Sequence, residues 1–428
     1  MRLTVWPERN TAVNPPPEVP IPNDRLNQVL SSALLGLEKN GRRKAREKAI
    51  VRILPASGNL GPRVLLEGEG EKPFLRMNSN GYLGLSLLSE VIESEEAATR
   101  EYGTGPGAVR FIGGTWGPHV KLERDLATFH GREAAMTFSS AYGAVLGVLA
   151  PLITSETAVI SDSLNHNSII SAVRMARPRE KYVYGHLDLA DLEARLDEAS
   201  QRCRRAIVVT DGVFSMRGDY APLKEIVKIA ANCDSKFPEN VLVVVDDSHG
   251  VGAFGATGRG TEEATGCGPV DLLIATLGKA IGVNGGYAVA NQTVIEYLRE
   301  VSPQYVYSNP ITPGEAAAAA KAIEILDGDQ GRERLAHLRE RTHQFEAGLA
   351  GMGFETVVSD HPIVPLMARE VKRLVALMDH LWANGILAAG LNFPVVPRGS
   401  EEIRFQISAD HTEADIDEVL GVLGKFAG

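Results

Sequence analysis

The sequence has few cysteines, no long apolar run and no excess of basic residues. Cys203, Cys233 and Cys267 are odd in number and lack the spacing of a metal site or a disulfide framework, which fits a reducing cytoplasm. No run approaches the roughly eighteen apolar residues of a transmembrane helix, so we expect no membrane partner. The beginning, MRLTVWPERN, has charge and proline where a secretory signal has an apolar core. A net charge of -10 argues against a nucleic-acid partner.

The composition indicates a globular enzyme of more than one domain. The chain has 428 residues, of which 44% are hydrophobic, so it can bury a large core. We expect an N-terminal arm and helix over residues 1–75, a large domain over 76–310 and a small C-terminal domain over 311–428.

The N-terminal part begins with a proline-rich stretch to Asp24, which predicts a loosely held arm. Apolar residues then recur at helical spacing from Leu26 to Leu37, ended by Asn40 and Gly41. This stripe needs a covering surface, either the chain's own core or a second subunit. The basic run that follows contains Arg42, Arg43, Lys44, Arg46 and Lys48. Such a run is usually a solvated face, and a phosphate-rich ligand such as coenzyme A is the alternative.

Strand and helix patterns alternate through the middle of the chain. Apolar strand-like runs start at Ala134, Ala158, Ala206 and Val241, and each ends in polar residues. This alternation predicts an α/β fold with a mostly parallel, doubly wound sheet whose carboxyl edge forms the site. A smaller α+β region follows a long alanine-rich helix that begins at Pro313.

Two other stretches have a local signature. Arg63 to Met77 is expected to form a β-hairpin around Gly68 and Gly70. Residues 102–115 are dense in glycine, as expected of backbone that approaches a ligand closely.

The most informative stretch runs from Val241 to Gly286. Val241 to Val245 is a β-branched apolar run typical of a strand buried on both faces, and Asp246, Asp247 and His249 follow its carboxyl end. A second apolar run ends shortly before Lys279, with glycines close behind it. A lysine amine with a nearby carboxylate is what pyridoxal 5'-phosphate (PLP) chemistry requires, because an acid must pair with the pyridine nitrogen.

Simpler interpretations exist for each of these residues. An aspartate at a strand end is often a helix cap, and a lone lysine is usually a solvated surface residue. A metal site on Asp246, Asp247 and His249 is disfavoured because neighbouring residues of a strand point in opposite directions. Likewise, the small-residue turn at Ser139 and Ser140 is a candidate phosphate cradle at a helix start, and an ordinary N-cap there is a simpler interpretation that is compatible with it.

Taken together, several motifs resemble the α-oxoamine synthases, which are fold-type I PLP enzymes that condense an amino acid with an acyl-CoA. The likeness is strongest to the glycine C-acetyltransferase branch. It rests on motifs that occur in order: 79-SNGYLGL-85, 109-VRFIGGT-115, 165-NHNSI-169, 210-TDGVFSM-216, 246-DDSHG-250, 276-TLGKA-280 and 403-IRFQISADHT-412.

The resemblance implies a role for individual residues. Lys279 would bind PLP covalently and then act as the base on the substrate α-carbon, while Asp246 would pair with the pyridine nitrogen. His166 would stack on the ring, and His249 and Ser215 would lie near its phenolic oxygen. The remaining implied contacts are to the phosphate, from Ala141, Tyr142, Thr276 and, across a dimer interface, Ser308, and to the substrate carboxylate, from Asn80 and Arg404.

The resemblance also implies the reaction and the partners. A small amino acid, glycine first, would react with an acyl-CoA, acetyl-CoA first, in a homodimer with its site at the subunit interface. Gly113 departs from the cysteine usual in the glycine C-acetyltransferase branch, and Tyr142 and Gly143 also differ from that branch. These departures leave open a longer acyl donor, an acyl-carrier protein or another amino acid. A PLP-fold binding module without catalysis is a remote alternative, because the lysine, the acid and the arginine are all present.

Overall fold

The computed structural model describes residues 23–40, 43, 47–393 and 395–426. The described residues up to Lys48 belong to one unit and those from Ala49 onward to another, and each unit is described by itself. The expected arm falls on residues outside the described part, except for Asn23 and Asp24. Gly41 and three members of the basic run, Arg42, Lys44 and Arg46, also lie outside the described residues.

In the first unit, the helix predicted after residue 23 is confirmed as α1 (Asp24–Lys39). Its apolar stripe is exposed: Val29 is 64% exposed, and Leu26 and Leu30 are more than half exposed. Helix α1 has no buried residue. Within the described part of its own unit the stripe therefore has no covering surface.

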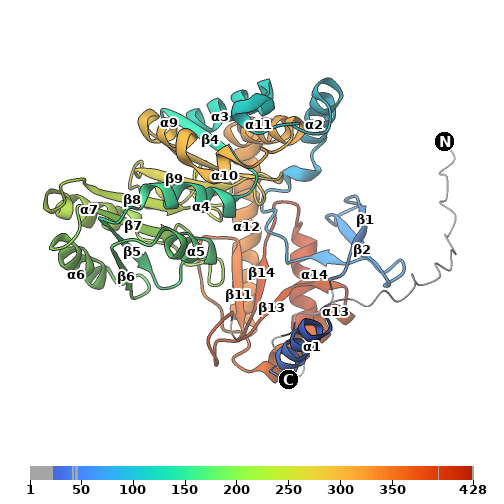
Figure 1. Ribbon diagram of the computed structural model, residues 1–428. Helices are drawn as coiled ribbons and strands as arrows, with labels where there is room; N and C mark the ends of the chain where they lie inside the picture. Colours follow the sequence, from blue (N-terminus) through green and yellow to red (C-terminus); the bar gives the residue numbers. More distant parts are fainter. Residues whose placement is uncertain (1–22, 41–42, 44–46, 394, 427–428) are drawn as a thin grey trace. The chain divides into compact units, whose positions relative to one another are not determined.

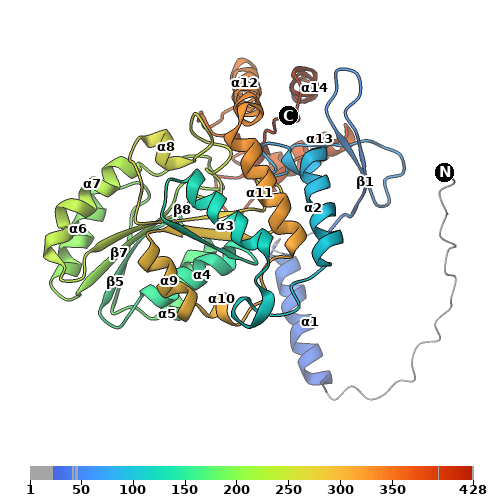
Figure 2. The same ribbon diagram turned by 90° about the horizontal axis from the view of Figure 1, so that it is seen from above.

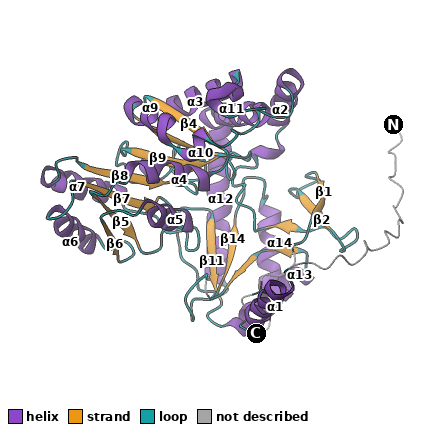
Figure 3. Cartoon of the chain, in the orientation of Figure 1, coloured by secondary structure: helices purple, strands orange, loops and turns teal. Residues whose placement is uncertain are grey.

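The second unit is built on a seven-stranded sheet in the order β4-β10-β9-β8-β7-β5-β6 (Figures 1 and 3). Strand β10 runs antiparallel to both of its neighbours, whereas β9, β8, β7, β5 and β6 are parallel. The mostly parallel sheet predicted from the sequence is confirmed. The strands are β4 (Ala134–Phe138), β5 (Thr157–Asp162), β6 (Glu180–Tyr184), β7 (Arg205–Asp211), β8 (Val241–Asp246), β9 (Leu272–Thr276) and β10 (Gly286–Ala290).

Helices cover both faces of this sheet. Successive side chains of β8 point to opposite faces of the sheet, so Val243 and Val245 pack in one buried core and Val244 packs in the other. Figure 2 shows the helices that cover the same face as Val244 grouped together. They are α4 (Ala141–Leu152), α5 (Asn167–Ala176), α9 (Gln292–Val301) and α10 (Pro303–Val306). The opposite layer contains α3 (Gly117–Phe129), α6 (Leu189–Ser200), α7 (Leu223–Cys233) and α11 (Pro313–Asp327).

A smaller antiparallel sheet follows α11, in the order β11-β14-β13. The alanine-rich helix starts where predicted, with Thr312 and Glu315 forming a capping box. The elements after it are α12 (Asp329–Gly351), β11 (Ile363–Met367), α13 (Val371–Ala383), β12 (Ile386–Leu387), β13 (Ala389–Leu391), β14 (Glu402–Gln406) and α14 (Glu413–Leu423).

The expected hairpin over residues 63–77 is only partly present. Its strands are β2 (Arg63–Leu66) and β3 (Leu75–Arg76), and between them Val64 pairs with Phe74. The main partner of β2 is β1 (Ile50–Leu54), and β3 pairs with β12. The sequence did not predict strand β1, because its apolar residues do not alternate with polar ones. In the structure these residues are mostly exposed.

Several other elements were also missed. The longest is α2 (Ser89–Tyr102), with 14 residues. The others are η1 (Leu85–Leu87), η2 (Arg110–Gly114), α5, β6, η3 (Asp234–Lys236), α8 (Thr261–Thr265), α10, β12 and β13. Among the described residues, no helix has both the length and the apolar character needed to span a bilayer.

Candidate active site

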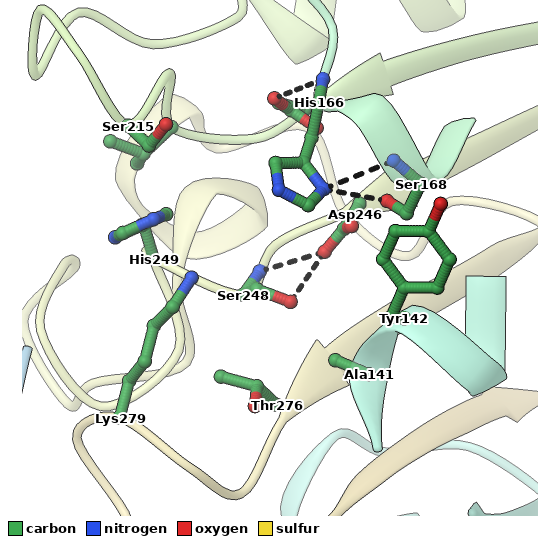
Figure 4. A pocket seen from close by; sticks show the side chains of 12 residues that line it. Ala141, Tyr142, His166, Ser168, Ser215, Asp246, Ser248, His249, Thr276 and Lys279 are labelled. Carbon is green, nitrogen blue, oxygen red and sulfur yellow. Dashed lines mark hydrogen bonds between the residues drawn. The ribbon is translucent and has the colours of Figure 1, made fainter. Parts of the chain in front are cut away.

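A cavity of about 280 Å³ opens at the carboxyl ends of the central strands (Figure 4). Its walls come from the ends of β7, β8 and β9, the starts of α4 and α5, and the loops after β5, β7, β8 and β9. The predicted site residues that line it are Ala141, Tyr142, His166, Ser215, Asp246, His249, Thr276 and Lys279. The remaining lining residues, which sequence reasoning did not single out, are Ser168, Asp211, Val213 and Ser248.

Lys279 lies in the loop that leaves β9. Its side chain is directed toward Ser248 and His249 (Figure 4). Burial lowers the pKa of its amine to about 8, while Asp246 and Asp211 oppose that shift. A larger fraction of this amine is therefore neutral near pH 7 than in an exposed lysine, as a nucleophile or base must be.

Asp246 ends β8 and faces the cavity. One of its carboxylate oxygens accepts hydrogen bonds from the Ser248 hydroxyl at 2.5 Å and the Ser248 N–H at 3.2 Å. Asp247 points elsewhere: it is completely buried and accepts two bonds from Thr261. The predicted divergence of the two aspartates is confirmed, and no metal-binding cluster occurs among the described residues.

His166 caps α5 and is held by the missed residue Asp211. The His166 backbone N–H donates to one Asp211 oxygen at 3.0 Å, and the imidazole Nδ1 lies 2.7 Å from the Ser168 hydroxyl. The other Asp211 oxygen is buried without a hydrogen-bond partner. Burial, and then the neighbouring Asp246, raise the pKa of Asp211 well above its usual range. Asp211 sits opposite Asp246 on the adjacent strand β7, so the strand register could have revealed it.

His249 is fixed through both its ring and its backbone. The Tyr82 hydroxyl lies 2.8 Å from its Nδ1, and the His361 ring N–H donates to its carbonyl oxygen at 2.9 Å. Burial, followed by the charge of Lys279, lowers the pKa of His249 well below its usual value. The neutral imidazole is therefore available as a hydrogen-bond partner inside the cavity.

The start of α4 provides free backbone donors at another wall. Ser140 caps the helix through Gly143, which leaves the N–H groups of Ala141 and Tyr142 without an intrahelical acceptor. Gly286 makes this position possible, because a Cβ there would lie 2.4 Å from the Ala141 Cα. The Thr276 hydroxyl is nearby on β9 and lines the same cavity. A helix start with free N–H groups suits a phosphate.

The other predicted residues do not line the cavity. Arg404 lies on β14 and donates to the Ser215 carbonyl at 2.8 Å, and its charge lowers the pKa of Lys279 and His249. Asn80 lies 3.0 Å from the Gln406 amide, next to Arg404. Ser308 is partly exposed, and its hydroxyl donates to the carbonyl of Asn309 at 3.4 Å. Residues 102–115 contribute nothing to the lining of this cavity.

Comparison with known proteins identifies the family. Residues 72–423 match the model for aminotransferase class I and II. A mitochondrial 2-amino-3-ketobutyrate coenzyme A ligase of Bos taurus is 40% identical over 373 residues, or 86% of each chain. An 8-amino-7-oxononanoate synthase of Bacillus velezensis is 40% identical over 368 residues, 86% of this chain and 91% of that one. The chain belongs to the α-oxoamine synthase family.

Solved structures agree with this placement. A serine palmitoyltransferase of Sphingomonas wittichii has a TM-score of 0.83 at 27% identity, covering 94% of this α-oxoamine synthase and 97% of that chain. The serine palmitoyltransferase of S. paucimobilis, in which PLP is bound, has a TM-score of 0.82 at 26% identity, covering 94% and 98%. The fold is therefore that of fold-type I PLP enzymes, and PLP is the cofactor of this α-oxoamine synthase.

The residues of the cavity fit PLP. The buried amine of Lys279, whose pKa is lowered, suits the aldehyde of PLP. The strand-end carboxylate of Asp246 suits the pyridine nitrogen, and the helix start with free N–H groups suits the phosphate. The close approach of Gly286 to Ala141 would be lost with any larger residue. These features lie around one cavity of suitable size.

Proposed function

We propose that this α-oxoamine synthase condenses glycine with acetyl-CoA, forming a β-keto amino acid and releasing coenzyme A. In the reaction the acyl group replaces a hydrogen on the amino acid α-carbon, and the thioester carbon–sulfur bond breaks. The observation that carries the proposal is that Lys279 and Asp246 line one cavity of about 280 Å³. Ligand pockets commonly measure about 300–1,000 Å³, so this cavity is close to the size of a cofactor site. The choice of glycine and acetyl-CoA is supported by the likeness to the 2-amino-3-ketobutyrate coenzyme A ligase.

Each lining residue has a place in this proposal. PLP, when bound, withdraws electrons from the substrate α-carbon. Asp246, which accepts a hydrogen bond from the Ser248 hydroxyl, would pair with the pyridine nitrogen of PLP. Lys279, whose pKa is about 8, accepts the α-proton when neutral. His166 covers one wall of the ring site, and His249 supplies a neutral imidazole beside Ser215.

The substrate carboxylate is assigned to Arg404, with Asn80 beside it. The guanidinium of Arg404 is largely buried and its pKa is lowered by that burial, so an anionic ligand would stabilise it. Each of the two terminal nitrogens of Arg404 still has one N–H to donate, which suits bidentate binding of a carboxylate.

We further propose that the active form is a homodimer. The phosphate contact assigned to Ser308 requires a second subunit, because Ser308 does not line this chain's own cavity. The apolar stripe of α1 has no cover among the described residues of its own unit, and a second subunit would supply one. The molar mass in solution, measured by light scattering together with activity, checks this; full activity at the mass of a monomer would contradict it.

A second candidate has specific support. The Bacillus velezensis 8-amino-7-oxononanoate synthase is as similar as the Bos taurus ligase, at 40% identity. A longer acyl donor, or alanine or serine in place of glycine, is therefore the alternative.

The test is a substrate matrix on the PLP-bound enzyme. Glycine, alanine and serine are each combined with acetyl-CoA, a medium-chain acyl-CoA and palmitoyl-CoA, and the coenzyme A thiol released is followed with a thiol reagent. Glycine with acetyl-CoA should give the highest kcat/KM. A maximum at another pair would establish the alternative, and no thiol release with any pair, acyl-carrier-protein donors included, would refute catalysis of this type.

A further inference from the structure

His186, just after β6, lies between two carboxylates beside the active site. Its Nδ1 is 3.0 Å from an Asp162 oxygen and its Nε2 is 3.2 Å from an Asp219 oxygen. Ionised carboxylates can only accept hydrogen bonds, so both ring nitrogens must carry a hydrogen and the imidazole must be positively charged. Burial acts against this charge, but the bonds and charges of the two aspartates raise the pKa of His186 to about 9.

One of the two carboxylates is a fixed point. Asp162 ends β5, is buried, and also accepts hydrogen bonds from the backbone N–H groups of Leu164 at 2.8 Å and Leu187 at 3.0 Å. The central sheet therefore holds Asp162 in place. His186 bonds to both carboxylates and so ties Asp219 to this fixed residue.

Asp219 belongs to a loop that contributes to the cavity. This loop, residues 212–221, is closed by a bridge between Val213 and Tyr220, and its Phe214 N–H donates to the Asp219 carbonyl at 2.9 Å. The Phe214 ring also meets the His186 imidazole edge-on, with the ring centres 4.4 Å apart. His186 thus contacts the loop at two places. Val213 and Ser215 of the same loop line the cavity.

The loop in turn holds Arg404. The Ser215 carbonyl accepts from Nη1 of Arg404 at 2.8 Å. With its amide oxygen turned toward the guanidinium, Gln406 accepts from Nη2 at 2.8 Å and from Nε at 3.0 Å. These bonds leave one N–H on each terminal nitrogen of Arg404 for a ligand. The Ser215 carbonyl is thus the acceptor that orients the guanidinium from the loop side.

We propose that His186 is a positioning residue for carboxylate recognition: by joining Asp162 to Asp219 it fixes the 212–221 loop and, through Ser215, the orientation of Arg404. The inference rests on the proposed function, in which Arg404 binds the substrate carboxylate. Arg217 also donates to the same Asp219 oxygen at 2.8 Å, but it belongs to the loop and does not join it to β5. Without the imidazolium, Asp219 would lose its link to Asp162, and the loop would be free to shift away from β5. Arg404 would then lose one of its fixed acceptors.

The test compares a ligand with a carboxylate and one without. PLP-bound wild type, His186→Phe and the control His380→Phe are titrated with glycine and with methylamine, and binding is read from the absorption of the cofactor. His380 is a suitable control because it is a partly buried histidine bonded to a backbone carbonyl in the small sheet region. Asp219→Asn provides a second, milder variant, and thermal melting verifies that each protein is folded.

We expect His186→Phe and Asp219→Asn to weaken glycine binding by about tenfold or more, since a charged hydrogen bond is worth that much. Methylamine binding should change by less than about twofold, because it does not use Arg404. Equal weakening of both ligands, or unchanged glycine binding in folded variants, would overturn the role of His186. A wild type whose spectrum responds to no amino acid would instead contradict the proposed function itself.

Discussion

Replacing Lys279 by methionine removes a buried amine while keeping a side chain of similar length. Burial lowers the pKa of Lys279 from 10.5 to about 8. A change of one unit in pKa corresponds to about 1.4 kcal/mol. The protonated Lys279 amine therefore lowers the free energy of unfolding of the cofactor-free protein by about 3 kcal/mol. The Lys279→Met protein without PLP should therefore be more stable than the wild type at pH 7 by about that amount.

The dependence on pH separates this effect from simple packing. Between pH 8 and 10.5 the amine of Lys279 is protonated in the unfolded chain and mostly neutral in the folded protein, so the free energy of unfolding of the wild type rises with pH. Below pH 8 the amine is protonated in both states, and the full destabilisation of about 3 kcal/mol is present. Most of the advantage of Lys279→Met should therefore be lost at pH 10.

The assay is urea unfolding of the cofactor-free proteins at pH 7 and pH 10, followed by circular dichroism. Lys224→Met, at an exposed position of α7, is the matched control and should change stability little at either pH. If Lys279→Met is no more stable than the wild type at pH 7, or if its advantage is the same at both pH values, the argument from burial is wrong.

Three further substitutions test separate parts of the site. Asp246→Asn should retain PLP but lower kcat by about 10²–10⁴-fold, measured by thiol release, because the pyridine nitrogen loses its charged partner. Gly286→Ala should weaken PLP binding by displacing Ala141, measured by cofactor titration; Gly421→Ala, with nothing within 4 Å of its Cβ, should not. Asp211→Asn keeps the acceptor for His166 and should change kcat/KM by less than about tenfold, whereas a larger loss would show that Asp211 must ionise.

Much of the central sheet could be predicted because its signals are local. The apolar run Val241–Val245 and the polar residues after it are visible in the sequence, and β8 ends at Asp246. The lysine after the next strand, Lys279, faces the same cavity because the carboxyl ends of parallel strands meet at one edge of a sheet. These residues lie together in the structure, and their individual roles stay predictions.

What could not be predicted depends on contacts between distant parts of the chain. Arg404 meets Ser215 across a long sequence separation, and no local pattern reveals that contact. Asp211 was overlooked because a carboxylate at a strand end is equally typical of a cap. Its place in the cavity lining, opposite Asp246, and its partnerless buried oxygen mark it as part of the site. Strand β1 was missed because its apolar residues do not alternate with polar ones.

The most direct test of the account is to locate the cofactor. The purified enzyme with bound PLP is reduced with borohydride, digested and analysed by peptide mass spectrometry. The account predicts a phosphopyridoxyl group on Lys279 and none in the Lys279→Ala protein. A label on another lysine, or no label in an enzyme that still releases coenzyme A from glycine and an acyl-CoA, would contradict it.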